Sequence, residues 1–166
     1  MNLCTLRFEW YRAGADRHWD EMAAWADACT PPDARFITPP WLEGWRCLSR
    51  RGTLVQYRDG SAMDWYPGFA EGWWARLDAI GCRMLPNVPD RRGRLRERYL
   101  AMTPADLVAA AERYGTDYVV MPANWPWADA LASAHANPGY RAYEVEALCT
   151  WKAPPAGGRG EEGCDG

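Results

Sequence analysis

The stretch ARFITPPWLEGWRCLSRRGTLVQYRDG, residues 34–60, decides the fold expected for this chain. It opens with a short apolar strand at residues 34–38, which ends at two prolines, and it leads to a second strand at residues 53–57. The Asp-Gly pair that follows marks a turn. Tryptophans and arginines lie between the two strands, and another arginine follows the second one. The same stretch therefore predicts part of a sheet and the place of a binding site.

Helical patterns lie on both sides of this stretch. Residues 16–29 carry apolar side chains at three-and-four spacing. Residues 67–81 have a proline in the first turn and a glycine at the end, as helices often do. Residues 103–115 begin with a Thr-Pro pair that can cap a helix and close at a glycine. Residues 94–101 and 125–136 predict two more helices.

Three further strands are expected. DYVVMP, residues 117–122, is a continuous apolar run, which is typical of a strand covered on both faces. Residues 3–11 alternate weakly, whereas residues 140–151 alternate well and predict a long strand at the edge of the sheet. The residues expected on one face of that long strand are Tyr143, Val145, Ala147, Cys149 and Trp151.

Strand and helix alternate along the chain, which predicts an α/β fold. We expect one small layered domain at residues 1–153, with a mostly parallel sheet of four to five strands flanked by helices. The tail at residues 154–166 is rich in glycine and charge and is expected to be disordered. In parallel sheets ligands bind beyond the carboxyl ends of the strands. The segments after Phe36, Val55 and Val120 are therefore expected to meet at one edge.

Composition and charge narrow the class of protein. The net charge of -3 gives no general attraction to nucleic acid, and no nucleic-acid partner is expected. Lys152 is the one lysine, so nearly all the positive charge is arginine, a bias that function or genomic base composition could produce. The sequence has no apolar run long enough to span a membrane and no apolar signal-peptide core. A chain complete as given is therefore expected in the cytoplasm.

Few signatures of catalysis or metal binding are present. The six cysteines form no CxxC pair, which argues against a zinc knuckle and leaves their disulfide state open. His18 and His135 lack metal-ligand spacing, and the sequence contains no nucleophile elbow and no P-loop. Neither a cofactor nor a metal is expected. The remaining acid/base candidates are Asp59 and Asp64, which flank the turn after the second strand, because a general acid or base needs only a positioned carboxyl.

Arginines and aromatic residues around the second strand form the main candidate site. Guanidinium groups suit a phosphate and aromatic rings suit the face of a sugar, so together they could bind a sugar phosphate. The ligand-binding candidates are Trp45, Arg46, Arg51, Tyr57, Arg58, Trp74 and Arg76. The alternative is that these arginines pair inside the fold with Glu43, Asp59, Glu71 and Asp78.

A second group of arginines lies in DRRGRLRERY, residues 90–99. This run is interpreted as the solvated face of a helix. The alternative is contact with a membrane surface or a partner.

The order of several motifs resembles a known group of proteins. The motifs are TPPDARFITPP, WLEGWR, SRR, QYRDG, WWARL and RYGTDYVVMP, between residues 16 and 122. This order is similar to the soluble C-terminal portion of bacterial multi-spanning membrane proteins of unknown function, which look like glycosyltransferases that use lipid-linked sugars. The matched positions are Pro39, Pro40, Gly44, Arg46, Arg51, Tyr57, Trp74 and Arg76. The resemblance implies no catalytic role for them, because the acidic catalytic residues of such enzymes lie in the membrane part.

The resemblance and the arginine-aromatic site lead to one expected function. The chain is expected to be a non-catalytic domain of, or derived from, a bacterial membrane protein, on the extracytoplasmic face of the membrane. It would bind a glycan, a lipid-linked sugar phosphate or the membrane-embedded partner domain. The alternatives are a small enzyme that acts on a sugar or phosphorylated substrate through Asp59 or Asp64, and a protein-interaction module.

Overall fold

A computed structural model describes residues 16–66, 68–82 and 90–150. The strand expected at residues 3–11 and the tail expected at residues 154–166 lie outside these ranges. The helices are α2 (Arg17–Cys29), α3 (Trp45–Ser49), α4 (Phe69–Ala79), α5 (Arg91–Leu100), α6 (Pro104–Tyr114) and α7 (Val145–Cys149), with the 3-10 helices η1 (Tyr57–Asp64) and η2 (Ala128–Ala130). The strands are β1 (Arg35–Ile37), β2 (Gly52–Thr53), β3 (Tyr118–Pro122), β4 (His135–Ala136) and β5 (Tyr140–Glu144).

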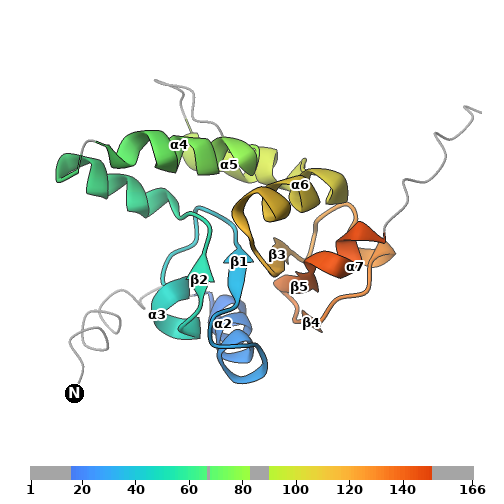
Figure 1. The fold of residues 1–166 in the computed structure, drawn as a ribbon. Helices are drawn as coiled ribbons and strands as arrows, with labels where there is room; N and C mark the ends of the chain where they lie inside the picture. The colour runs from blue at the N-terminus through green and yellow to red at the C-terminus, as the bar shows by residue number, and fades with distance from the viewer. Residues whose placement is uncertain (1–15, 67, 83–89, 151–166) are drawn as a thin grey trace, which may run out of the picture.

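The five strands form one sheet in the order β2-β1-β3-β5-β4 (Figure 1). Strand β1 pairs in parallel with β2 on one side and with β3 on the other. Strand β5 is antiparallel to both of its neighbours, β3 and β4. The expected α/β class and strand number are confirmed, but the expectation of a mostly parallel sheet is wrong, because the sheet is mixed.

The mixed sheet follows from the segment between β3 and β5. A parallel return to the sheet needs a long crossover, usually a helix. The helix expected at residues 125–136 does not form, and only η2 and β4 lie there. Instead, the Trp125 indole N–H donates to the carbonyl of Met102 at 3.0 Å, which ties this segment to the residues that follow α5. Asn137 then turns the chain, because its side-chain oxygen accepts from the backbone N–H groups of Gly139 and Tyr140.

Two other expected strands are shorter than the sequence pattern predicts. The strand expected at residues 53–57 is reduced to β2, because Asp59 accepts from the backbone N–H of Gln56 and starts η1 in a capping box. The strand expected at residues 140–151 ends at Glu144, and α7 follows. Leu148 of α7 is 2% exposed in the core that α6 also lines, so tertiary packing overrides the local alternation.

The best helix predictions rested on capping chemistry. Helix α6 begins at Thr103, whose hydroxyl accepts from the backbone N–H of Asp106, and it ends at Gly115 with a φ of 61°. Helix α2 and the buried strand β3 also lie where the pattern predicts them. These elements carry their own start and stop signals, so tertiary context changes them little.

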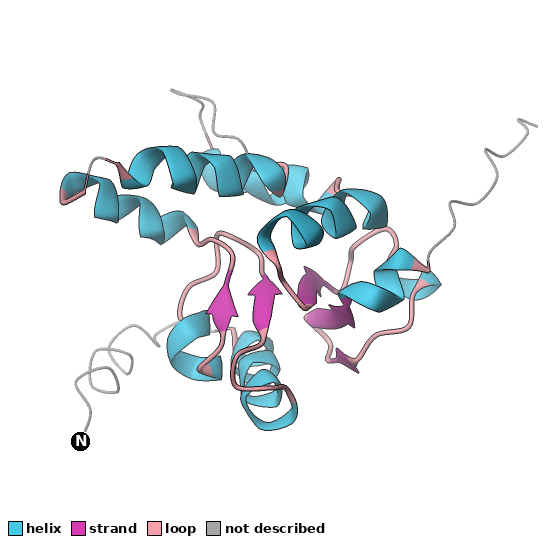
Figure 2. Cartoon of the chain, viewed as in Figure 1, coloured by secondary structure: helices cyan, strands magenta, loops and turns pink. Residues whose placement is uncertain are grey.

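Helices cover both faces of the sheet (Figure 2). Phe36 of β1 and Val120 of β3 point to one face, where they pack in one core cluster with residues of α2 and α3. Their neighbours Ile37 and Val119 point to the other face, where residues of α4, α5, α6 and α7 form the larger cluster. Alternation along each strand thus produces two cores from the same short segments.

Candidate functional site

The exits of β1, β2 and β3 lie at one edge of the sheet, as the sequence predicts, because these three strands are parallel neighbours. A hydrogen bond of 2.7 Å from the backbone N–H of Tyr57 to the carbonyl of Pro40 ties together the segments that leave β2 and β1. The geometric requirement for a site at strand ends is therefore met.

Buried aromatic side chains occupy this edge. Trp73 of α4 is 2% exposed, and its indole N–H donates to the carbonyl of Gln56 at 3.1 Å. Tyr99 of α5 is fully buried, and its hydroxyl donates to the carbonyl of Val120 at 2.8 Å. The ring of Trp41 packs edge-on against Tyr99 at 5.5 Å. Aromatic rings at the strand exits thus close the edge with hydrogen bonds to the backbone.

The titratable groups inside this core are unsuited to acid/base or nucleophilic work. The Cys82 thiol is fully buried and lies 3.6 Å from the carbonyl of Leu95. Burial raises the pKa of this thiol to about 12, so it stays protonated at neutral pH and is a weak nucleophile. Burial also raises the pKa of Tyr99 well above its ordinary value. Both side chains serve the packing of the core.

Arg46 is bound at the base of η1. It makes a bidentate contact with Asp59, with nitrogen–oxygen distances of 2.7 and 2.8 Å, and it also donates to the side chain of Gln56 at 3.2 Å. Asp59 therefore accepts two hydrogen bonds from Arg46 and one from the backbone of Gln56. This pair braces the turn after β2, which is the internal pairing that the sequence left open as the alternative.

Arg51 joins α2 to the segment between α3 and β2. Its side chain is 7% exposed, and its guanidinium donates to the carbonyls of Asp27 at 2.8 Å and Thr30 at 2.7 Å. These carbonyls lie at the carboxyl end of α2, where the helix dipole favours a cation. Arg50 beside it makes an exposed, bidentate pair with Asp27 at 2.7 and 2.8 Å. The two adjacent arginines therefore bind the same end of α2, Arg51 through buried contacts and Arg50 through an exposed one.

The other candidate residues lie in several environments. Trp45 is fully buried between Trp19 and Phe36, with ring centroids 5.0 and 4.9 Å away. Arg58 is exposed and pairs with Glu43 at 2.7 Å. The remaining candidates lie on two neighbouring elements, with Tyr57 on η1 and with Trp74 and Arg76 on α4.

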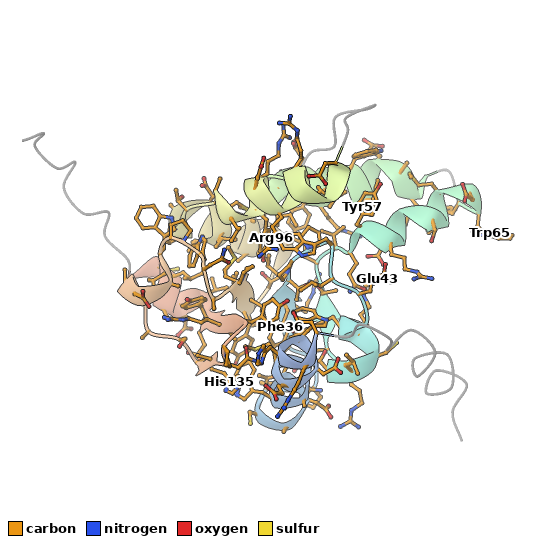
Figure 3. The ribbon with its side chains drawn as sticks, turned by 180° about the vertical axis from the view of Figure 1, so that it is seen from behind. Phe36, Glu43, Tyr57, Trp65, Arg96 and His135 are labelled. Atoms are coloured by element: carbon orange, nitrogen blue, oxygen red, sulfur yellow. The ribbon has the colours of Figure 1, made fainter. Side chains whose placement is uncertain are left out.

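Helices η1 and α4 form a helical hairpin that projects from the body of the molecule, and we call the described residues 57–66 and 68–79 the aromatic hairpin (Figure 1). The exposed large hydrophobic side chains of the described residues all lie on it: Trp65 at 89%, Tyr66 at 67% and Trp74 at 37%. Trp65 points away from the protein at the hairpin tip (Figure 3). Burying such rings stabilises a protein, so their exposure marks a surface that can contact something else.

The base of the aromatic hairpin is built to hold these rings in place. Gly60 of η1 lies so close to Trp73 of α4 that a β-carbon on it would come within 2.7 Å of the indole ring. The Trp73 ring is flanked by Trp74 at 4.6 Å and by Tyr57 at 5.9 Å. The backbone N–H groups of Trp65 and Tyr66 both donate to the carbonyl of Ala62. The hairpin is therefore an ordered platform with apolar rings at its outer end.

The sequence interpretation did not select Trp65 and Tyr66. They follow Asp64 and precede a Pro-Gly pair between two helical segments. Such connections lie on the surface of proteins, so adjacent aromatic residues there could have been recognised as exposed. Asp64 itself is exposed beside Trp65, whereas Asp59 lies at the base of the hairpin in its pair with Arg46.

Both histidines contact other side chains of the protein. His18 lies 3.3 Å from the Glu21 carboxylate on α2, and the His135 ring stacks on Trp25 at 4.9 Å with the planes 6° apart. Within residues 16–66, 68–82 and 90–150, no cluster of three or more metal-ligand side chains is found. The helices in these ranges are also too short or too polar to cross a membrane.

Comparison with known protein families finds a match for part of the chain. Residues 17–80 match the model of a family described as a domain of unknown function, DUF6798. Its description names neither a membrane part nor an activity. No curated protein and no solved structure matches this chain. The matched segment contains the Arg46–Asp59 and Arg51–Asp27 contacts and the aromatic hairpin, so it includes all the candidate ligand-binding residues.

Proposed function

We propose that this chain is a non-catalytic binding domain of, or derived from, a bacterial membrane protein of the glycosyltransferase-like type. Its ligand would be a glycan or a lipid-linked sugar phosphate, bound on the aromatic hairpin at the extracytoplasmic face of the membrane. The observation that carries this proposal is the exposure of Trp65, Tyr66 and Trp74 on one ordered hairpin.

The chemistry of the exposed rings supports a sugar ligand. An indole offers a large rigid apolar face, against which the C–H face of a sugar ring can pack, and an N–H that can donate to a hydroxyl. Asp64 lies next to Trp65, and Glu71 is exposed on α4, so carboxylates that can accept from sugar hydroxyls flank the rings. Tryptophan and tyrosine are also enriched among the residues that contribute most to binding at protein interfaces.

A phosphate group on the ligand would be recognised by Arg76. This residue lies on α4 two positions beyond Trp74 and is partly exposed. Guanidinium groups bind phosphate through two parallel hydrogen bonds. Arg46 and Arg51 are poorer candidates for this role, because each would first have to give up its contacts with Asp59 or with the end of α2.

A panel of soluble glycans and a short polyprenyl-phosphate sugar in detergent would test the proposal. We expect wild-type protein to bind at least one of them, and Trp65→Ala or Trp74→Ala to weaken binding at least about tenfold. Arg76→Ala should weaken binding of the phosphorylated ligand alone. Arg17→Ala is the matched control, because Arg17 is 86% exposed on α2, outside the hairpin. Binding that is the same in wild type and in all three hairpin variants would refute this site.

The enzyme alternative predicts a different result with the same ligands. If Asp64 acts as an acid or base on a sugar substrate, Asp64→Asn should abolish turnover while binding changes little. Product analysis after long incubation separates the two functions, since a binding domain returns its ligand unchanged.

A further inference from the structure

We infer that the side of the molecule formed by the aromatic hairpin and α5 docks on an anionic lipid bilayer, with Trp65 and Tyr66 entering the membrane interface and the arginines of α5 contacting lipid phosphates. This inference goes beyond sugar binding and does not depend on it, because it concerns bulk anionic lipid.

The first support is the shape and chemistry of the hairpin tip. Trp65, which lies at the outer end of a projecting element (Figure 3), is 89% exposed, and its neighbour in the chain, Tyr66, is 67% exposed. Tryptophan and tyrosine concentrate at the level of lipid headgroups, where an apolar ring and a polar N–H or O–H are both accommodated. A projecting tip can bring these rings to that depth without moving the rest of the protein.

The second support is the charge of α5. Residues 90–99 contain five arginines, against the acids Asp90 and Glu97, and therefore carry a net charge of +3 in a chain whose net charge is -3. Leu95 and Tyr99 of this helix are buried, whereas Arg94 and Arg96 are exposed. An amphipathic helix that buries its apolar side in the protein and presents arginines outward is suited to an anionic surface.

The third support is the arrangement of the two features. The hairpin and α5 run along the same side of the molecule, opposite α2 and α3 (Figure 1). The segment that follows α4, at the body end of the hairpin, also meets α5, since a β-carbon on Gly81 would lie 3.4 Å from the carbonyl of Arg98. One side of the molecule therefore carries both the exposed rings and the arginine-rich helix α5.

The net charges of the aromatic hairpin and of α5 differ in sign, so the two elements would contribute differently to membrane binding. Residues 57–79 carry four acids against two arginines, so the hairpin alone has no attraction to anionic lipid. The arginines of α5 would supply the attraction, which salt screens, and the rings would supply the contact, which salt affects little. Neutral bilayers should consequently bind the protein weakly.

Flotation with vesicles tests the inference with the whole chain and without any sugar lipid. The probes are vesicles of phosphatidylcholine alone and of phosphatidylcholine mixed with phosphatidylglycerol, each at low and at high salt. We expect binding to the anionic vesicles that falls at high salt and weak binding to the neutral ones. Arg94→Gln combined with Arg96→Gln should weaken binding at least about tenfold, because each arginine near an anionic surface contributes about a fivefold increase in affinity.

Two further variants complete the test. Trp65→Ala combined with Tyr66→Ala should weaken binding severalfold, whereas Arg17→Gln, an exposed arginine on the opposite side, should leave it unchanged. Thermal unfolding checks that each variant is folded. The inference is overturned by an absence of binding, by binding that is equal on neutral and anionic vesicles, or by an equal loss with Arg17→Gln. Glycan binding in solution with no vesicle binding would retain the proposed function and overturn this inference alone.

Discussion

At the base of the aromatic hairpin Trp73 is 2% exposed and its N–H is bound to the carbonyl of Gln56, whereas at the tip Trp65 is 89% exposed. The charged groups follow the same division. Arg46 and Asp59 at the base satisfy each other, while Asp64 at the tip is open to solvent. The base is thus organised by internal contacts, and the tip is free to make external ones. The contrast separates residues that hold the hairpin in shape from residues that could contact a ligand.

The largest effect should come from a buried arginine outside the hairpin. Arg51→Ala would leave the carbonyls of Asp27 and Thr30 without their donor and should lower the free energy of unfolding by about 3 kcal/mol. Arg50→Ala is the matched control, because Arg50 binds the same Asp27 but is 74% exposed, and it should destabilise the protein far less than Arg51→Ala does. Urea denaturation measures both. Equal losses for the two variants would show that the buried contacts of Arg51 contribute no more to stability than the exposed pair of Arg50. Arg51 would then again be a candidate for ligand binding.

A smaller effect is expected within the hairpin base. Gly60→Ala would place a β-carbon 2.7 Å from the Trp73 ring and should destabilise the protein by about 2 kcal/mol. Gly72→Ala on α4 meets nothing within 4 Å, so it should stabilise the protein by about 0.5 to 1 kcal/mol. Thermal unfolding compares the two substitutions. A neutral Gly60→Ala would mean that the ring is free to move and that the hairpin is no fixed platform.

The smallest effect concerns acid stability. The pKa of Asp27 is lowered, first by its hydrogen bond from Arg50. Because the folded-state pKa lies below the unfolded value of about 3.9, this carboxylate contributes stability above that pH and loses it as the pH falls toward the folded value. The difference in stability between wild type and Arg50→Ala should therefore shrink between about pH 5 and about pH 3. Denaturation across this range measures it, and a constant difference would contradict the assignment.

Local signals in the sequence predicted the elements that carry their own boundaries. Helix α6 has its threonine cap and closing glycine, and β3 has a continuous apolar run, so both were predicted correctly. The common edge for the exits of β1, β2 and β3 was also predicted. What failed were residues 125–136 and 140–151, where a buried tryptophan contact and packing against α6 outweigh the local pattern.

The sequence predicted the region of the candidate site, but only the structure shows which of its residues are paired or buried and which are exposed. An arginine near a strand end looks the same in sequence whether it binds a ligand or a neighbouring carboxylate. The burial of Trp45 is hidden in the same way, since Trp45 and Trp65 both lie in aromatic-rich segments and only the Pro-Gly pair after Tyr66 marks Trp65 as exposed. Which of them faces solvent depends on α2 and the sheet, which pack around Trp45.

Taken alone, the amino-acid order determined the α/β class, the capped helices and the region where a site would lie, because caps, breakers and apolar periodicity act over a few residues. The tertiary structure decided the direction of β5, the separate partners of Arg46 and of Arg51, and the exposure of the hairpin tip. These features depend on contacts between segments far apart in the chain, such as the contact between Thr30 and Arg51, which are 21 positions apart. No local pattern encodes which distant partner a guanidinium or a ring will meet.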